Sequence, residues 1–154
     1  MGIEIERKFL VNNNDWKAQA SCSYLKQAYL SSEPGRIVRV RIDGESAELT
    51  IKGISTGISC GEWNYSIPLA DAKELLNTVC LQPPIEKYRY RLPMGDLMWE
   101  IDEFLGANAG LVVAEIELPS EHHDFLRPDW LGEEVSHDRR YANANLLKHP
   151  FKDW

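Results

Sequence analysis

Residues 3–11 read Ile-Glu-Ile-Glu-Arg-Lys-Phe-Leu-Val, with a charged side chain at every second position from Glu4 to Lys8. In a β-strand, alternate side chains point to the same face, so Glu4, Glu6 and Lys8 share one face and mostly apolar residues share the other. Two carboxylates and an ammonium in a row on a strand are suited to a metal-assisted phosphate site. For this strand alone, an edge strand with a solvated charged face is an equally good interpretation.

The same alternation of charged and apolar residues recurs in six later segments. In residues 86–91, for example, the cations Lys87 and Arg89 alternate with Tyr88 and Tyr90. The basic residues on these charged faces are Lys8, Arg39, Arg41, Lys52, Lys87, Arg89 and Arg91. The acidic residues on them are Glu4, Glu6, Glu62, Glu100, Asp102 and Glu117. Repetition in so many segments weakens the interpretation of a single solvated edge strand.

Turn residues separate these period-2 segments. They predict strands near residues 3–11, 23–31, 36–43, 46–53, 60–68, 85–92, 97–104 and 111–119. Helical composition predicts helices near residues 14–20, 70–79 and 140–148. No linker or repeat divides the chain, so we expect residues 1–154 to form a single domain. The expected fold is mainly β, an eight-stranded antiparallel β-barrel tunnel with flanking helices, because closure removes exposed strand edges.

The charged faces could point outward, as paired surface residues, or inward, as the wall of a tunnel. Eight strands enclose an interior that is barely wide enough for an apolar core. The predicted helices at 70–79 and 140–148 also need an apolar outer wall on which to pack. Because inward charged faces leave that wall apolar, we expect the charges to line a tunnel.

Composition narrows the functional class. The net charge of −7 argues against a surface that coats nucleic acid. We also expect no membrane partner, since the sequence has neither a long apolar run nor a signal peptide. Cys22, Cys60 and Cys80 lack metal-binding spacing and are expected to be free thiols in the cytoplasm. The four histidines also lack the spacing of a zinc site.

A buried set of cations facing carboxylates is costly unless a ligand compensates both. A polyanion with a divalent metal would do so, because arginine forks bind phosphate oxygens and carboxylates bind Mg²⁺ or Mn²⁺. The charge pattern therefore predicts a small polyanionic substrate and a Mg²⁺ or Mn²⁺ cofactor.

The charged residues also stand in motifs of a known family. These are Glu4-x-Glu6-x-Lys8, Gln27-Ala28-Tyr29-Leu30, Val38-Arg39-Val40-Arg41, Leu49-Thr50-Ile51-Lys52-Gly53, Glu86-Lys87-Tyr88-Arg89, Glu115-Ile116-Glu117-Leu118 and the segment from Asp138 to Leu146. With these motifs in order along nearly its whole length, the chain resembles the CYTH domain of the triphosphate tunnel metalloenzymes, in their short bacterial form. The resemblance implies an eight-stranded antiparallel tunnel that binds triphosphate compounds with a divalent cation.

The resemblance further implies roles for individual residues. Phosphates would be bound by Lys8, Arg39, Arg41, Lys52, Lys87 and Arg89, and metal by Glu4, Glu6, Glu62 and Glu117. Tyr29 matches a tyrosine that is proposed as a proton acceptor in short members, and we hypothesise that Lys87 assists it. Where relatives often have several alternating glutamates, this chain has Glu62, Asn64 and Ser66, which leaves open whether one or two metal ions bind.

The leading functional hypothesis is metal-dependent hydrolysis of a triphosphate, with inorganic tripolyphosphate split to diphosphate and phosphate. Nucleoside or thiamine triphosphates are alternative substrates. Two other functions stay open: a class IV type adenylate cyclase, which would need a site for adenine, and a non-catalytic protein that only binds polyphosphate or nucleotide. The sequence does not predict an oligomeric state.

Overall fold

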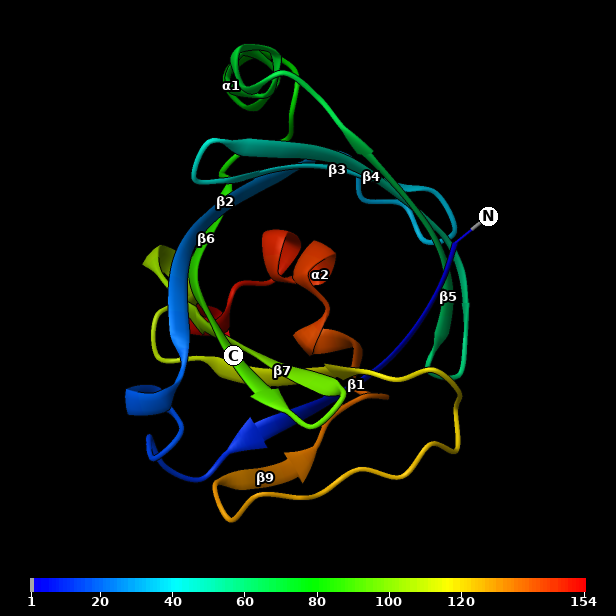
Figure 1. The fold of residues 1–154 in the computed structure, drawn as a ribbon. Coiled ribbons are helices and arrows are strands. Elements are labelled where there is room, and N and C mark those ends of the chain that lie inside the picture. The colour runs from blue at the N-terminus through cyan, green and yellow to red at the C-terminus, as the bar shows by residue number, and fades with distance from the viewer. Residues whose placement is uncertain (1) are drawn as a thin grey trace.

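The strands of the computed structural model, which describes residues 2–154, are all antiparallel. They are β1 (Ile3–Val11), β2 (Ser21–Ser31), β3 (Ile37–Asp43), β4 (Ser46–Thr56), β5 (Ser59–Ser66), β6 (Ile85–Met94), β7 (Leu97–Phe104), β8 (Val112–Glu117) and β9 (Leu131–Glu134). Eight of them close into the ring β1-β5-β4-β3-β2-β6-β7-β8, which Figure 1 shows nearly end-on. The predicted eight-stranded barrel is confirmed.

Strand β1 closes the ring because its two halves pair with different strands. Residues 3–5 pair with 59–61 of β5, and residues 6–10 pair with 113–117 of β8. The short strand β9 pairs with β1 at Phe9 and Val11. This ninth strand was not predicted, because Leu131-Gly-Glu-Glu134 has no alternation of apolar and polar residues. At the hairpins, Gly44 and Gly95 take the positive φ angles, 62° each, that such turns demand of the backbone.

Helix α1 (Leu69–Thr78) packs on the outer wall of the barrel, as expected for the helix predicted at 70–79. Its buried Ala72 and Leu76 lie in one apolar cluster with Val40 of β3 and Ala47 of β4. These residues lie on the faces of β3 and β4 that point away from the charged side chains. The outer wall is therefore apolar where the helix covers it.

The C-terminal segment does not pack on the outer wall, and that prediction for residues 140–148 was wrong. The segment forms a 3-10 turn (Arg139–Tyr141) followed by α2 (Asn143–Lys148), which lies inside the ring in Figure 1. Ala144 and Leu146 pack with Tyr29 and other inward apolar residues of the barrel. The small apolar face of α2 thus fills part of the lumen, and its Asn143 reaches the charged side chain of Lys87.

Other segments cover a second part of the outer wall. Trp99 of β7 and Phe9 of β1 pack with Trp16, Phe125 and Trp130, which lie in the connections between strands. The helix predicted at 14–20 is reduced to a 3-10 turn, Lys17–Gln19, whose role is to place Trp16. Within residues 2–154, no helix is both long and apolar enough to cross a membrane.

Candidate active site

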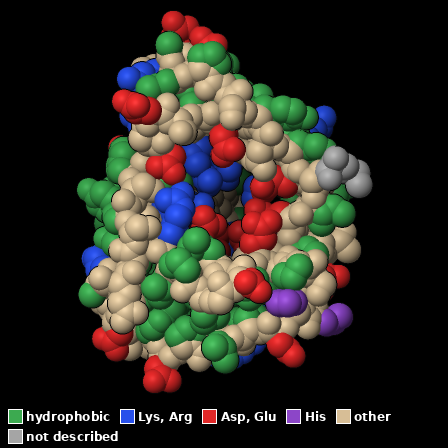
Figure 2. Space-filling view, viewed as in Figure 1, with side chains coloured by type: hydrophobic (Ala, Val, Ile, Leu, Met, Phe, Trp, Pro, Cys, Tyr) green, Lys and Arg blue, Asp and Glu red, His purple; other side chains and the backbone are tan. Residues whose placement is uncertain are grey.

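The charged strand faces line a cavity of about 540 Å³ inside the barrel. Figure 2 shows its mouth, where Lys and Arg side chains gather toward the upper left and Asp and Glu lie mainly to the right and below, with further acidic side chains at the rim beside the cations. The site residues predicted from the sequence all line it: Glu4, Glu6, Lys8, Tyr29, Arg39, Arg41, Lys52, Glu62, Lys87, Arg89 and Glu117. The structure therefore brings together every residue that the sequence assigned to the site.

Basic and acidic residues occupy opposite halves of the ring. Among the neighbouring strands β4, β3, β2 and β6, strand β4 carries the cation Lys52, β3 carries Arg39 and Arg41, and β6 carries Lys87 and Arg89, while β2 contributes Tyr29. The neighbouring strands β7, β8, β1 and β5 carry the acids Glu100, Glu115, Glu117, Glu4, Glu6 and Glu62. Lys8 on β1 and Glu48 on β4 are exceptions to this division. The cavity can therefore bind an anion on one wall and a cation on the other.

Arg39 and Arg41 form the centre of the basic wall. Arg39 Nη2 donates to Thr50 Oγ1 (3.2 Å) and Arg41 Nε donates to Gln27 Oε1 (3.0 Å). Within residues 2–154 neither guanidinium has a carboxylate within 4.0 Å, and Arg39 Nε has no hydrogen-bond partner although Arg39 is only 8% exposed. Burial together with the nearby Arg39 and Arg89 lowers the pKa of Arg41 to about 9. A buried and a half-buried guanidinium without counter-ions form a strong anion site.

Lys87 and Arg89 differ from these arginines because both are held by Asp102, which lies behind them. Lys87 Nζ is 2.7 Å from Asp102 Oδ2, and Arg89 donates to both carboxylate oxygens at 2.8 and 2.9 Å. Burial opposes ionisation of Asp102, but Arg89 and Lys87 hold its pKa far below the usual range. Burial and the neighbouring Arg89 and Arg41 lower the pKa of Lys87 to about 7, against the opposing pull of Asp102.

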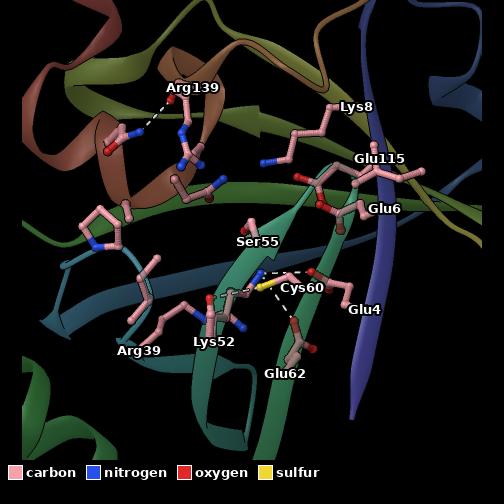
Figure 3. Close-up of a pocket in the computed structure, with 18 of the residues that line it drawn as sticks. Glu4, Glu6, Lys8, Arg39, Lys52, Ser55, Cys60, Glu62, Glu115 and Arg139 are labelled. Carbon is pink, nitrogen blue, oxygen red and sulfur yellow. Dashed lines mark hydrogen bonds and ion pairs between the residues drawn. The ribbon is translucent and has the colours of Figure 1, made fainter. Parts of the chain in front are cut away.

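On the acidic wall, Glu4 and Glu62 share Lys52, whose ammonium lies 3.1 and 3.4 Å from their carboxylates (Figure 3). Burial raises the pKa of Glu4 to about 7. Burial opposes ionisation of Glu62 too, but hydrogen bonds from Glu4 and Asn64 and the charge of Lys52 lower its pKa to about 2. Asn64, which stands where relatives often carry glutamate, donates to Glu62 Oε1 at 2.8 Å and so supports the remaining carboxylate.

Glu6 is a crowded carboxyl of the acidic wall. Burial, with Glu115 and Glu4 beside it, raises its pKa well above the ordinary value. Burial followed by repulsion from Glu62 and Glu100 also raises the pKa of Glu117. Among residues 2–154 no three acidic, His or Cys side chains are assembled as a metal site. The donor set nevertheless fits Mg²⁺ or Mn²⁺, because hard oxygens are crowded on one wall with too few cations.

Tyr29 and Lys87 are connected through other residues. Lys87 Nζ donates to Asn143 Oδ1 (2.8 Å), and Gln27 Nε2 donates both to that oxygen (3.1 Å) and to the Tyr29 hydroxyl (3.2 Å). The tyrosine that the sequence paired directly with Lys87 is therefore linked to it by Gln27 and by Asn143 of α2.

Several residues of the cavity were not among the predicted site residues. Glu115 lines it beside Glu6, and its alternation with Glu117 was the available signal. Arg139, Asn143 and Asn145 enter from the C-terminal segment, for which alternation gives no signal. Arg91 and Asp102 share strand faces with site residues but do not line the cavity.

Comparison with known proteins agrees with this geometry. The model of the CYTH domain family matches residues 2–148. An inorganic triphosphatase of Acetivibrio thermocellus is 47% identical over 154 residues, covering 100% of this chain and 99% of the relative. An inorganic triphosphatase of Nitrosomonas europaea is 36% identical and covers 93% of this chain and 95% of the relative. A crystal structure of an inorganic triphosphatase superposes with a TM-score of 0.65 at 31% identity, over 93% of this chain and 96% of that one.

The acidic wall predicts that the metal-free protein loses stability as the pH rises from 5 to 7. The pKa of Glu4 is about 7 in the folded chain against an ordinary value of 4.5. Stability that the bound proton supplies below pH 4.5 is therefore lost as the pH rises through 7. By linkage, Glu4 alone accounts for about 2 kcal/mol of the loss between these pH values. Urea unfolding at several pH values in the presence of EDTA measures this loss in the free energy of unfolding.

Two variants control this measurement. Glu4→Gln, which cannot ionise, should reduce the dependence and leave the part that comes from Glu6 and Glu117, whereas Glu45→Gln at an exposed turn should leave it unchanged. An unfolding free energy that depends on pH equally in wild type and Glu4→Gln would contradict the assignment of a proton to Glu4.

Proposed function

Because the chain belongs to the CYTH domain family, we propose that it hydrolyses inorganic tripolyphosphate to diphosphate and phosphate with a divalent cation. One observation carries the proposal: the guanidiniums of Arg39, which is buried, and Arg41, which is half-buried, lack counter-ions and lie across the cavity from a wall of crowded carboxylates. A substrate that carries several negative charges together with a divalent cation neutralises both walls at once. Relatives named inorganic triphosphatase that span nearly the whole chain support the same conclusion.

The cations of the cavity then bind phosphate groups. We assign this role to Lys8, Arg39, Arg41, Lys52, Lys87 and Arg89. Arg39 and Arg41 have forks free of carboxylates and can bind phosphate oxygens through paired hydrogen bonds. Phosphoryl transfer requires little covalent chemistry from a protein, so positioned cations can provide much of the catalysis.

The divalent cation is assigned to the acidic wall, to Glu4, Glu6, Glu62 and Glu117. When bound, Mg²⁺ or Mn²⁺ supplies positive charge that offsets the charge developing on the phosphoryl oxygens. The crowding that raises the pKa of Glu6, by burial and by Glu115 and Glu4, favours replacement of protons by such a cation.

Tyr29 is assigned as the acceptor of a proton from the attacking water, with Lys87 assisting through Asn143 and Gln27. The hydrogen bond from Gln27 Nε2 to the Tyr29 oxygen holds the hydroxyl in place in the cavity wall. Lys87 adds positive charge at the far end of the same network.

The adenylate cyclase alternative has less support. A nucleotide base is commonly held by stacking on aromatic rings. Among the described residues that line the cavity, Tyr29 is the one aromatic side chain, and it is only 3% exposed. A non-catalytic protein differs from the proposed hydrolase in one observable respect: it binds tripolyphosphate but releases no phosphate.

Phosphate release tests the proposed function directly. Tripolyphosphate, ATP, GTP and thiamine triphosphate are compared with Mg²⁺, with Mn²⁺ and with EDTA, and cyclic AMP is measured in the same samples. We expect the largest kcat/KM for tripolyphosphate and no activity in EDTA. Cyclic AMP formed from ATP at a higher rate would overturn the proposal in favour of a cyclase, and tight binding without phosphate release would favour a non-catalytic protein.

Glu6→Gln should lower metal-dependent turnover by about 10²-fold, equivalent to about 3 kcal/mol of transition-state stabilisation. The substitution is nearly isosteric but removes a negative charge from the wall that we assign to the metal. Glu45→Gln, on an exposed turn, serves as the matched control and should retain full activity. Near-wild-type turnover of Glu6→Gln at saturating Mg²⁺ would refute the metal assignment.

Arg39→Lys and Arg41→Lys should weaken binding of tripolyphosphate more than binding of diphosphate. Lysine keeps the positive charge but loses the planar fork that binds two oxygens, a loss of about 1–2 kcal/mol for each arginine. Arg36→Lys is the control, because its side chain is 79% exposed. Calorimetry with Ca²⁺ as the divalent ion measures the affinities, and equal effects at all three positions would mean that Arg39 and Arg41 do not bind substrate.

Tyr29→Phe should lower kcat and flatten its rise toward alkaline pH, while substrate affinity stays close to that of the wild type. The phenyl ring keeps the packing of Tyr29 but cannot accept a proton. The exposed Tyr65→Phe is the control. A raised KM with an unchanged pH profile would instead show that the hydroxyl only hydrogen-bonds a phosphate.

A further inference from the structure

The cations of the basic wall fall into two groups. Arg39 and Arg41 have no carboxylate within 4.0 Å among residues 2–154, whereas Lys87 and Arg89 are both paired with Asp102. Asp102 is 0% exposed and does not line the cavity, so it cannot touch a bound substrate. Its contacts are with two side chains that do line it.

Both carboxylate oxygens of Asp102 accept hydrogen bonds from these two neighbours. Oδ2 accepts from Lys87 Nζ (2.7 Å) and from Arg89 Nη2 (2.9 Å), and Oδ1 accepts from Arg89 Nε (2.8 Å). One edge of the Arg89 fork is thereby fixed in the wall. Its Nη1 remains directed to Glu100 at 3.2 Å, at the edge of the cavity.

A buried ion cluster of this kind is weak evidence for stability, because apolar side chains of similar volume often stabilise a fold as well or better. Its geometric effect is more specific. Lysine has a flexible stem with four methylene groups, and a short ion pair to a buried carboxylate restricts where its ammonium can lie. The Asp102 pair, with the bond to Asn143, sets the position of Lys87.

We propose that Asp102 is a positioning residue for catalysis, one that fixes Lys87 and Arg89 in the cavity wall and keeps Lys87 cationic. This inference rests on the proposed function, because it concerns how the same site handles a triphosphate. It assigns a task to a buried carboxylate that contacts neither substrate nor metal.

The charge of Lys87 depends on several groups from the surrounding strands. Asp102 from β7 and Glu115 from β8 favour the ammonium, whereas Arg89 of β6 and Arg41 of β3 oppose it. Asn143 of α2 contributes a neutral acceptor. When Asp102 loses its charge, Glu115 is the one remaining acid of this set against two arginines, so the proton of Lys87 is released at a lower pH.

Asp102→Asn tests the proposal, with Asp43→Asn as the matched control because Asp43 also pairs with an arginine, Arg91, but lies outside the cavity. At saturating tripolyphosphate we expect kcat of Asp102→Asn to fall about tenfold or more, and the alkaline limb of its pH profile to move down by about one unit. The KM at pH 6 should not rise, because the wall gains net positive charge. Asp43→Asn should match the wild type.

A pH profile of Asp102→Asn that coincides with that of the wild type would overturn the proposal. So would a KM raised equally at every pH, which indicates a distorted cavity. If Asp102→Asn does not fold, Asp102→Glu replaces it, since it keeps the charge one methylene further out. It should retain the alkaline limb and lose turnover, and wild-type turnover of this variant would refute positioning.

The same variants are examined without substrate by NMR of 13C-labelled lysine side chains. Lys87 should titrate about one unit lower in Asp102→Asn than in the wild type and unchanged in Asp102→Glu. Identical titrations in Asp102→Asn and wild type would overturn the role of Asp102. Because this measurement needs no turnover, a wild type that fails to hydrolyse tripolyphosphate would defeat the proposed function alone.

Discussion

The separation of charge between the two halves of the barrel is the constraint on which the cavity depends. Ion pairs form where the halves meet. Lys52 pairs with Glu62 across the β4–β5 boundary, and Arg89 pairs with Asp102 across the β6–β7 boundary. Away from these boundaries, Arg39 and Arg41 face no carboxylate within 4.0 Å among residues 2–154, and the carboxyl of Glu6 is crowded by others. The charges in the middle of each wall can thus be compensated by a bound ligand of opposite charge.

Charge of this kind can be buried only because the outside of the barrel supplies the apolar packing. The strands present apolar residues outward, and α1, Trp16 and the segment around Phe125 and Trp130 cover many of them, although Tyr65 and Tyr88 stay exposed. Most of the favourable burial of apolar surface therefore lies between the barrel and its coverings. The interior of the barrel does not have to supply the apolar core. It can therefore hold polar groups arranged to bind the substrate.

Alternation along the strands was sufficient to predict the barrel and the inward direction of the charged faces. It could not predict depth along the barrel. Arg91 and Asp102 have the same alternation as Arg89 and Glu100, yet Arg91 pairs with Asp43 outside the cavity and Asp102 lies behind its wall. The position of α2 was also unpredictable, because an apolar helical stripe fits equally well inside or outside the ring.

The basic wall combines two physical solutions to the problem of binding phosphate. The planar guanidiniums of Arg39 and Arg41 hydrogen-bond to neutral side chains, so their full positive charge is free to attract phosphate. The cost is repulsion between the two guanidiniums. Lys87 is tied to a carboxylate and to Asn143, so it loses freedom but gains a defined position. A flexible ammonium near the reacting atoms would lose much of its effect through disorder, whereas catalysis by positioned charge requires that no reorganisation be needed when the reaction occurs. The buried carboxylate of Asp102 therefore gives Lys87 a fixed position. Arg39 and Arg41, which only attract the substrate, would gain less from such a partner.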